Sequence, residues 1–225
     1  MSLPPFLDAT AALVWKDLLS EFRTKDTLGA GVVFALLVLV IFNFAFELRV
    51  ENVEAVAPGV LWITFIFAGM LGIGRGFATE RDRGTLDGIL LAPIDRGALY
   101  LAKTLTNVLL MAMVEIVALP IAVALFNLRL AWTETILVVA LGTVGFAGVG
   151  TLIAAITSNT RAREVMLPLL LFPLAVPVVI ASVKATALAL GAQPTDSIPW
   201  LQLLAGFDAI LVATAFLVFE YVIED

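Results

Sequence analysis

The segment Glu80-Arg81-Asp82-Arg83-Gly84-Thr85-Leu86-Asp87-Gly88-Ile89-Leu90-Leu91-Ala92-Pro93 is the most highly charged part of a chain that is 61% hydrophobic and 14% charged. Long apolar runs precede and follow it. We therefore expect this segment to lie at a membrane surface. It is either an ordinary polar loop or a docking element for a cytoplasmic partner.

The middle of this segment predicts a short amphipathic helix. Gly84 breaks the preceding structure, Thr85 can cap the new helix, and Pro93 ends it. Asp87 lies in the first turn, where a negative charge favours the helix dipole. One face of the helix is apolar, and it comprises Leu86, Ile89, Leu90 and Pro93.

The apolar runs on either side define the class of protein. Several reach the roughly 20 residues that are needed to cross a hydrocarbon core about 30 Å thick. Membrane spans are helices or closed barrels, and continuous apolar runs are typical of helices. We therefore expect an all-α integral membrane protein with one transmembrane domain over residues 1–225. The six expected spans are about 28–46, 57–77, 99–126, 132–157, 165–185 and 200–221.

Three further segments complete this organisation. Residues 8–25 form an amphipathic helix with Trp15, which either lies on the membrane or packs on the protein's own core. Residues 78–97 form the region around the opening segment. Residues 186–199 are less apolar and form an outer loop or a short re-entrant segment.

The distribution of basic residues predicts the orientation. Six spans place both termini on one side of the membrane. Of the 13 lysines and arginines, only Arg49, Arg129 and Lys184 fall on the other side. The positive-inside rule then puts both termini and the opening segment in the cytoplasm.

Several kinds of chemistry are excluded by composition. The chain has no cysteine and no histidine, which removes thiol chemistry, the usual proton shuttle and the commonest haem ligand. A net charge of −6 gives no reason to expect nucleic-acid binding. No glycine precedes a lysine, so the phosphate-binding loop of ATPases is absent. If ATP drives the process, the ATPase is a separate polypeptide.

Polar and small residues inside the spans suggest helix contacts or a transport path. Glu115 and Asp208 lie in apolar runs, where an ionised acid costs on the order of 3 kcal/mol. They form either a substrate or relay path or interhelical hydrogen bonds. Glycines also recur in the second and fourth spans, where they allow close packing within one chain or at a homodimer interface. These glycines are Gly72, Gly76, Gly142, Gly145, Gly148 and Gly150.

The chain resembles the permeases of ABC-2-type exporters. An interfacial helix, six spans, and the pattern Glu-x-x-x-Gly-Thr-Leu-Asp followed by Leu-Leu-x-Pro carry this resemblance. One branch is closer, the haem exporter protein B (CcmB) family of cytochrome c maturation. The segments that resemble it include 22–25, 34–38, 57–62, 80–93, 142–146, 159–165, 167–173 and 219–222.

The resemblance implies a function and a set of partners. The chain would be a non-catalytic permease of the bacterial inner membrane. It would couple a separate ATPase to haem export or to release of a haem-loaded chaperone. The implied partners are a cytoplasmic ABC ATPase, a Trp-rich haem-handling membrane protein, a periplasmic haem chaperone and a second copy of the chain. The implied ATPase-binding residues are Glu80, Gly84, Thr85, Leu86, Asp87, Leu90, Leu91 and Pro93.

We expect no cofactor to be bound directly, with ATP on the partner and haem handled by the complex. Without histidine or cysteine, the remaining possible haem ligands lie isolated in or beside apolar runs, which favours packing roles. They are Met70, Met111, Met113, Met166, Tyr100 and Tyr221. Two other functions stay open: an ABC-2 permease that exports a lipid or drug, and a membrane scaffold that transports nothing.

Overall fold

The protein is all-helical, as the sequence predicts. A computed structural model describes residues 6–49, 53–160, 162–190 and 197–224, and no strand occurs in these ranges. The helices are α1 (Phe6–Thr24), α2 (Asp26–Arg49), α3 (Val53–Asp82), α4 (Thr85–Leu91), α5 (Arg96–Phe126), α6 (Trp132–Thr157), α7 (Arg163–Leu190) and α8 (Ile198–Glu224).

Six of these helices are long and apolar enough to cross a membrane: α2, α3, α5, α6, α7 and α8. Each predicted span lies within one of them. The main difference is at α3, which continues through polar residues to Asp82 and reaches 30 residues, or about 45 Å. Helix α7 extends to Leu190, and residues 191–196 lie outside the described residues, so the alternatives of an outer loop and a re-entrant segment stay open there.

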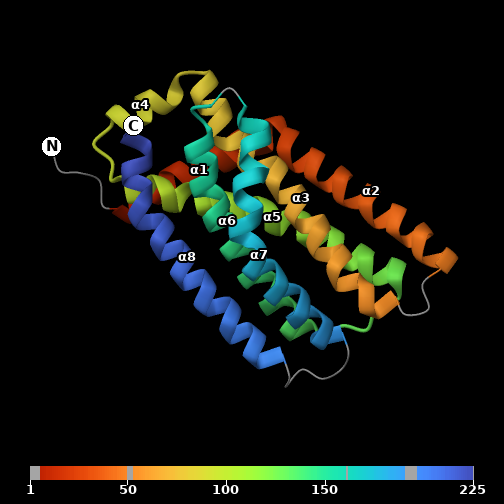
Figure 1. Cartoon of the computed structure of the whole chain (residues 1–225). Coiled ribbons are helices and arrows are strands. Elements are labelled where there is room, and N and C mark those ends of the chain that lie inside the picture. The colour runs from red at the N-terminus through yellow and green to blue at the C-terminus, as the bar shows by residue number, and fades with distance from the viewer. Residues whose placement is uncertain (1–5, 50–52, 161, 191–196, 225) are drawn as a thin grey trace.

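The spans pack as a bundle with α3 and α6 at its centre and α2 and α8 at its edges. Helix α1 crosses one end of the bundle, and α4 and the end of α8 lie at that same end (Figure 1). We call this the terminus end. The end of α2 and the loop after α5 lie at the opposite end (Figure 1).

Glycines on α6 allow its neighbours to approach its backbone. A Cβ atom on Gly142 would collide with Trp62 of α3, and one on Gly145 would collide with Asp208 of α8. A Cβ on Gly150 would lie 2.8 Å from Ile73 of α3. This glycine face of the fourth span therefore packs within the chain and is not available as a homodimer interface.

Helix α1 packs on the bundle, which is one of the two arrangements that its sequence left open. Ala9 and Leu13 are buried against the bundle. Trp15 and Phe22, in contrast, are 69% and 50% exposed. Helix α1 thus packs on the protein with a narrow face and leaves apolar side chains free for a membrane surface.

Candidate functional site

Helix α4 is a short surface helix that is held in place at both ends. It begins after Gly84, whose φ of 65° is in the left-handed region that favours glycine. The Thr85 hydroxyl donates a hydrogen bond of 3.1 Å to the Glu80 carbonyl, and Arg96 donates one of 2.9 Å to the Leu90 carbonyl. A helix of seven residues is not stable alone, so these contacts and buried Leu86 maintain it.

The predicted cap of α4 was wrong. Thr85 is the first helical residue, Gly84 occupies the cap position, and no side chain caps the helix. The left-handed Gly84 turns the chain directly into the helix, which leaves the threonine hydroxyl free to bond back to α3. The helix ends at Leu91, and Ala92 is extended, as is usual before a proline.

The residues predicted to bind an ATPase divide into buried and exposed groups. Glu80 and Leu86 are buried in the protein, and Leu90 is half-buried. Leu91 is 87% exposed, and the exposed surface also includes Gly84, Thr85, Gly88 and Pro93. The Asp87 side chain lies outside the described residues.

Glu80 belongs to a charge cluster that joins three helices. The cluster comprises Lys16 and Asp17 of α1, Glu80 of α3 and Lys103 of α5. The Lys103 ammonium lies 2.8 Å from Glu80 Oε1 and 2.9 Å from Asp17 Oδ2. Lys16 contacts both of the same carboxylates. The cluster therefore fastens α1 to the ends of α3 and α5.

Both lysines of the cluster lie against negative charges. Lys103 is only 4% exposed, and its ammonium also lies 5.6 Å from the centre of the Phe77 ring. Burial lowers the pKa of Lys16, but the hydrogen bond to Glu80 and the charges of Asp17 and Glu80 outweigh it, so the pKa is raised overall. The Lys16 contribution to stability is thus complete below its ordinary pKa and is lost only as pH rises through the higher folded-state value.

Lys16, Asp17 and Lys103 were not predicted as site residues. Lys16 and Asp17 are separated from Lys103 by more than 80 positions, so local spacing could not connect them. One signal was present: Lys103 is a charged residue inside a predicted apolar span, where a paired partner is expected.

The two acids inside the spans lie on opposite sides of α6 and differ in bonding. Glu115 of α5 accepts a hydrogen bond of 2.6 Å from Thr143 of α6. Asp208 of α8 lies against Gly145 of α6, and neither of its carboxylate oxygens has a hydrogen-bond partner among the described residues. Each acid is 5% exposed. Glu115 thus makes the interhelical bond that was one of its two predicted roles, whereas Asp208 does not.

The possible haem ligands are dispersed over the molecule. Tyr100 is fully buried and donates a hydrogen bond of 3.1 Å to the Gly148 carbonyl. Met111 is also buried and packs closely against Gly69. Met70, Met113 and Met166 are half-buried, and Tyr221 is 74% exposed. No group of three or more acids that could hold a metal occurs among the described residues.

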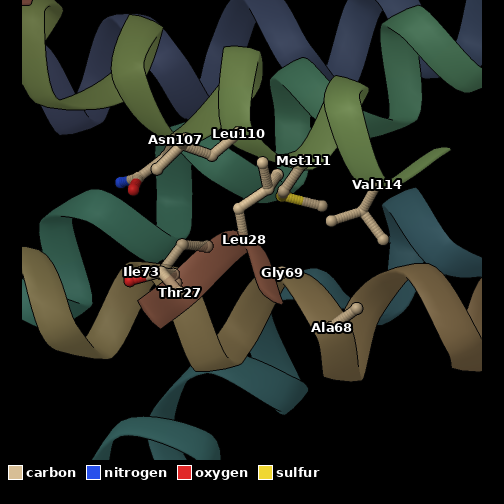
Figure 2. Close-up of a pocket in the computed structure, with 10 residues that line it drawn as sticks. Thr27, Leu28, Ala68, Gly69, Ile73, Asn107, Leu110, Met111 and Val114 are labelled. Carbon is tan, nitrogen blue, oxygen red and sulfur yellow. The ribbon is translucent and has the colours of Figure 1, made fainter. Parts of the chain in front are cut away.

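The cavity at the junction of α2, α3 and α5 is small. Thr27, Ile73, Met111 and Val114 line it from the three helices (Figure 2). The open volume there is about 10 Å³, which is about enough for a single water molecule. Asn107 borders this space, but its amide nitrogen donates to Thr151 of α6 at 2.9 Å. This junction is therefore a packed contact and not a ligand pocket.

A larger cavity of about 900 Å³ opens at the terminus end. Its walls come from α1, the start of α2, the second half of α3, α5, the end of α6 and the start of α7. Arg163 of α7 bridges to Asp82 of α3 at the rim through two bonds of 2.9 and 2.7 Å. The charge cluster forms another part of the wall.

Together, six membrane-spanning helices, a helix across one end and a short helix between the second and third spans define a multi-pass, all-helical membrane protein of the permease type. A family model described as "CcmB protein" matches residues 8–223. The chain belongs to the CcmB family.

Individual relatives agree with the family match. The chain is 31% identical over 205 residues to "Heme exporter protein B" of Rhodobacter capsulatus, covering 90% of this chain and 92% of that protein. Proteins of the same name from Paracoccus denitrificans and Bradyrhizobium diazoefficiens are 29% and 28% identical. These two alignments cover 84% and 80% of this chain, and 88% and 82% of the relatives.

Proposed function

We propose that this chain is the membrane permease subunit of an ABC-type complex that handles haem in cytochrome c maturation. The name "Heme exporter protein B", carried by its relatives, supports the haem assignment. The complex would lie in the bacterial inner membrane with the terminus end of this subunit in the cytoplasm. The excess of basic residues on that side supports this orientation.

The connection between α4 and the charge cluster is the observation that carries the proposal. The Glu80 carbonyl accepts the hydrogen bond from Thr85, while the Glu80 carboxylate binds Lys16 and Lys103. A displacement of α4 would act on α3 through one residue that also contacts α1 and α5. The protein therefore has a direct path from a surface helix to three elements of the bundle.

A separate ATPase would supply the displacement by docking on α4. The chain lacks a phosphate-binding loop, so hydrolysis would occur on the partner. Leu91 supplies an exposed apolar contact for that partner, and Pro93 extends the same surface. Two copies of the chain over two ATPase subunits would complete the complex.

The movement would release a haem-loaded chaperone from a Trp-rich membrane partner on the periplasmic side, or export haem with that partner. Two observations favour release over passage through this subunit. The chain has no histidine or cysteine for haem iron. The junction of α2, α3 and α5 is closed to anything larger than about one water.

The docking surface can be tested with two leucines at the same end of the bundle. Leu91→Ala removes an exposed side chain from α4, and Leu7→Ala removes one of similar exposure from α1. We expect Leu91→Ala to weaken binding of the purified ATPase subunit by about tenfold, since burial of one leucine is worth about 1.5–3 kcal/mol. Leu7→Ala is expected to bind like the unchanged protein, and equal effects would contradict docking on α4.

Haem ligation has a separate test. The subunit purified alone and titrated with haem is expected to show no absorption spectrum of a specific, axially ligated haem. A stoichiometric spectrum of that kind would contradict the release mechanism. It would direct attention to the more accessible of the possible ligands, which are Met70, Met113, Met166 and Tyr221.

Two other functions would give different results in these experiments. A permease that exports a lipid or drug would bind an ATPase through α4 but would not co-purify with a haem-handling membrane protein. A membrane scaffold would keep its partners after Leu91 or Gly84 is altered. Co-purification of the unchanged subunit with both an ATPase and a haem-handling protein would exclude the lipid or drug exporter, and weaker binding of the ATPase by Leu91→Ala would exclude the scaffold.

A further inference from the structure

The outer face of α3, between α2 and α7, is exposed, and we call this face the groove. Ile63, Phe67, Leu71 and Arg75 follow one another at intervals of four residues, and all are exposed. The Phe67 ring lies 6.3 Å from Phe34 of α2 and 5.6 Å from Phe172 of α7, measured between ring centres. Helix α3 thus forms the floor of the groove, and the other two helices form its walls.

The groove leads into the large cavity at the terminus end. Phe67, Leu71 and Arg75 all line that cavity of about 900 Å³. Its apolar part lies toward the middle of the bundle, and its charged part lies toward the rim, where Asp82 pairs with Arg163. The space is therefore amphipathic along the direction of the membrane normal.

Arg75 has no ionic partner among the described residues. It lies about 10 Å closer to the middle of the bundle than Asp82, at about 1.5 Å per helical residue. An arginine at this depth in a membrane requires an anion or a path to the interface. Arg83, which follows Asp82 at the rim and also lines the cavity, is likewise without an ionic partner among the described residues.

The acids that line the cavity are already engaged or lie at helix starts. Asp17 and Glu80 bind the two lysines of the charge cluster, and Asp82 binds Arg163. The Glu21 carboxylate accepts from the backbone amides of Thr27 and Leu28 at 2.8 and 2.7 Å. Asp26 and Glu164 lie in the first turns of α2 and α7, where helix dipoles offset their charge. Arg75 and Arg83 are the basic residues of the lining that have no ion pair among the described residues.

We propose that this groove binds an anionic phospholipid from the leaflet at the terminus end, with its phosphate on Arg75 and an acyl chain along Leu71, Phe67 and Ile63. The guanidinium group of arginine matches the geometry of a phosphate oxygen pair. Basic pockets between membrane helices are a known type of site for such head groups.

The dimensions of the groove fit one lipid leaflet. From Arg75 to Ile63 the helix rises about 18 Å, and half of a hydrocarbon core is about 15 Å. A phosphate at Arg75 therefore places the end of an acyl chain near Ile63. Arg83 lies farther out, where it can meet a second anionic group of the head. The site depends on the six spans alone and not on the proposed haem function.

The site can be tested by native mass spectrometry of the delipidated full chain titrated with phosphatidylglycerol or phosphatidylcholine. We expect tighter binding of phosphatidylglycerol, and Arg75→Gln is expected to weaken it by about fivefold or more. Arg23→Gln is the matched control, because Arg23 is exposed at the same end but does not line the groove. Arg83→Gln is expected to reduce the preference for phosphatidylglycerol over phosphatidylcholine.

Three results would overturn the proposal. The first is equal binding of the two lipids by the unchanged protein. The second is equal loss for Arg75→Gln and Arg23→Gln, which would indicate a general effect of surface charge. The third is displacement of phosphatidylglycerol by glycerol phosphate at equal concentration, which would indicate a site for free phosphates. Because Arg75 has no ionic partner among the described residues, Arg75→Gln is expected to keep its unfolding temperature in detergent without added lipid.

Discussion

Lys103 and Lys16 bind the same two carboxylates from different environments. Lys103 is buried inside α5, whereas nearly half of the Lys16 side chain is exposed on α1. Removing one partner from a buried ion pair leaves an uncompensated charge, which is costly. An exposed pair contributes little because water screens it. Lys103 is therefore expected to contribute more to the free energy of unfolding than Lys16.

This difference predicts unequal effects of the same substitution. Lys103→Met is expected to lower the free energy of unfolding by about 3 kcal/mol, because Glu80 and Asp17 lose their buried cation. Lys16→Met is the matched control and is expected to cost at most about 1 kcal/mol. Denaturation of the purified proteins in mixed detergent would measure both values. Equal losses of unfolding free energy in the two variants would contradict this difference between the buried and the exposed lysine.

The sequence predicted polar residues inside spans but not which of them meet. Glu115 and Asp208 were correctly placed in apolar helices, yet nothing in the sequence showed that they flank the same part of α6. The rotation of each helix about its axis decides this, and helices that are apolar on all sides give no periodic signal for it. For the same reason, the sequence did not show that Lys103 pairs with Asp17 of α1.

Helix α4 is the element whose prediction was most complete. Its position, its amphipathic pattern and its end before Pro93 followed from local residue types. The error at its start, where Gly84 replaces Thr85 as the cap, arose because a threonine hydroxyl can cap its own helix or bond to a preceding carbonyl. Contact with α3 decided between these two options.

The two glycines of this region are expected to respond oppositely to alanine. Gly84→Ala places a side chain at a φ of 65°, which costs about 1–2 kcal/mol. Gly88→Ala adds a methyl group to an exposed helical position with nothing within 4 Å, which favours the helix by roughly 0.5–1 kcal/mol. Hydrogen exchange of the α4 amides should therefore become faster in the first variant and slower in the second. A change in the same direction for both would contradict the role of Gly84.

At the scale of the whole molecule, the apolar runs of the sequence were sufficient to predict an architecture of six membrane-spanning helices. The number, length and order of the spans follow from apolar runs of about 20 residues, because a bilayer imposes that length. The arrangement of the spans could not be predicted, since small residues permit close packing without selecting a partner. The glycines of α6 illustrate this, because they were compatible with a dimer interface but pack inside the chain.

The absence of native cysteine allows a direct test of orientation. Leu91→Cys places a thiol on exposed α4, and Arg129→Cys places one at the opposite end of the bundle. In spheroplasts, a membrane-impermeant thiol reagent is expected to label the second variant but to reach the first only after permeabilisation. The reverse pattern would contradict the basic-residue assignment, and the unchanged protein should give no label.

The length of α3 has a mechanical consequence. The helix is a single rod of about 45 Å that connects the approach to α4 with the opposite end of the bundle, and its only proline, Pro58, lies close to its start. A tilt of about 5° about one end would move the other end by about 4 Å, which approaches one helical turn. Because α3 is this long, a small rotation at either end of the bundle is coupled to a displacement of several ångströms at the other end. No helix has to bend for this movement.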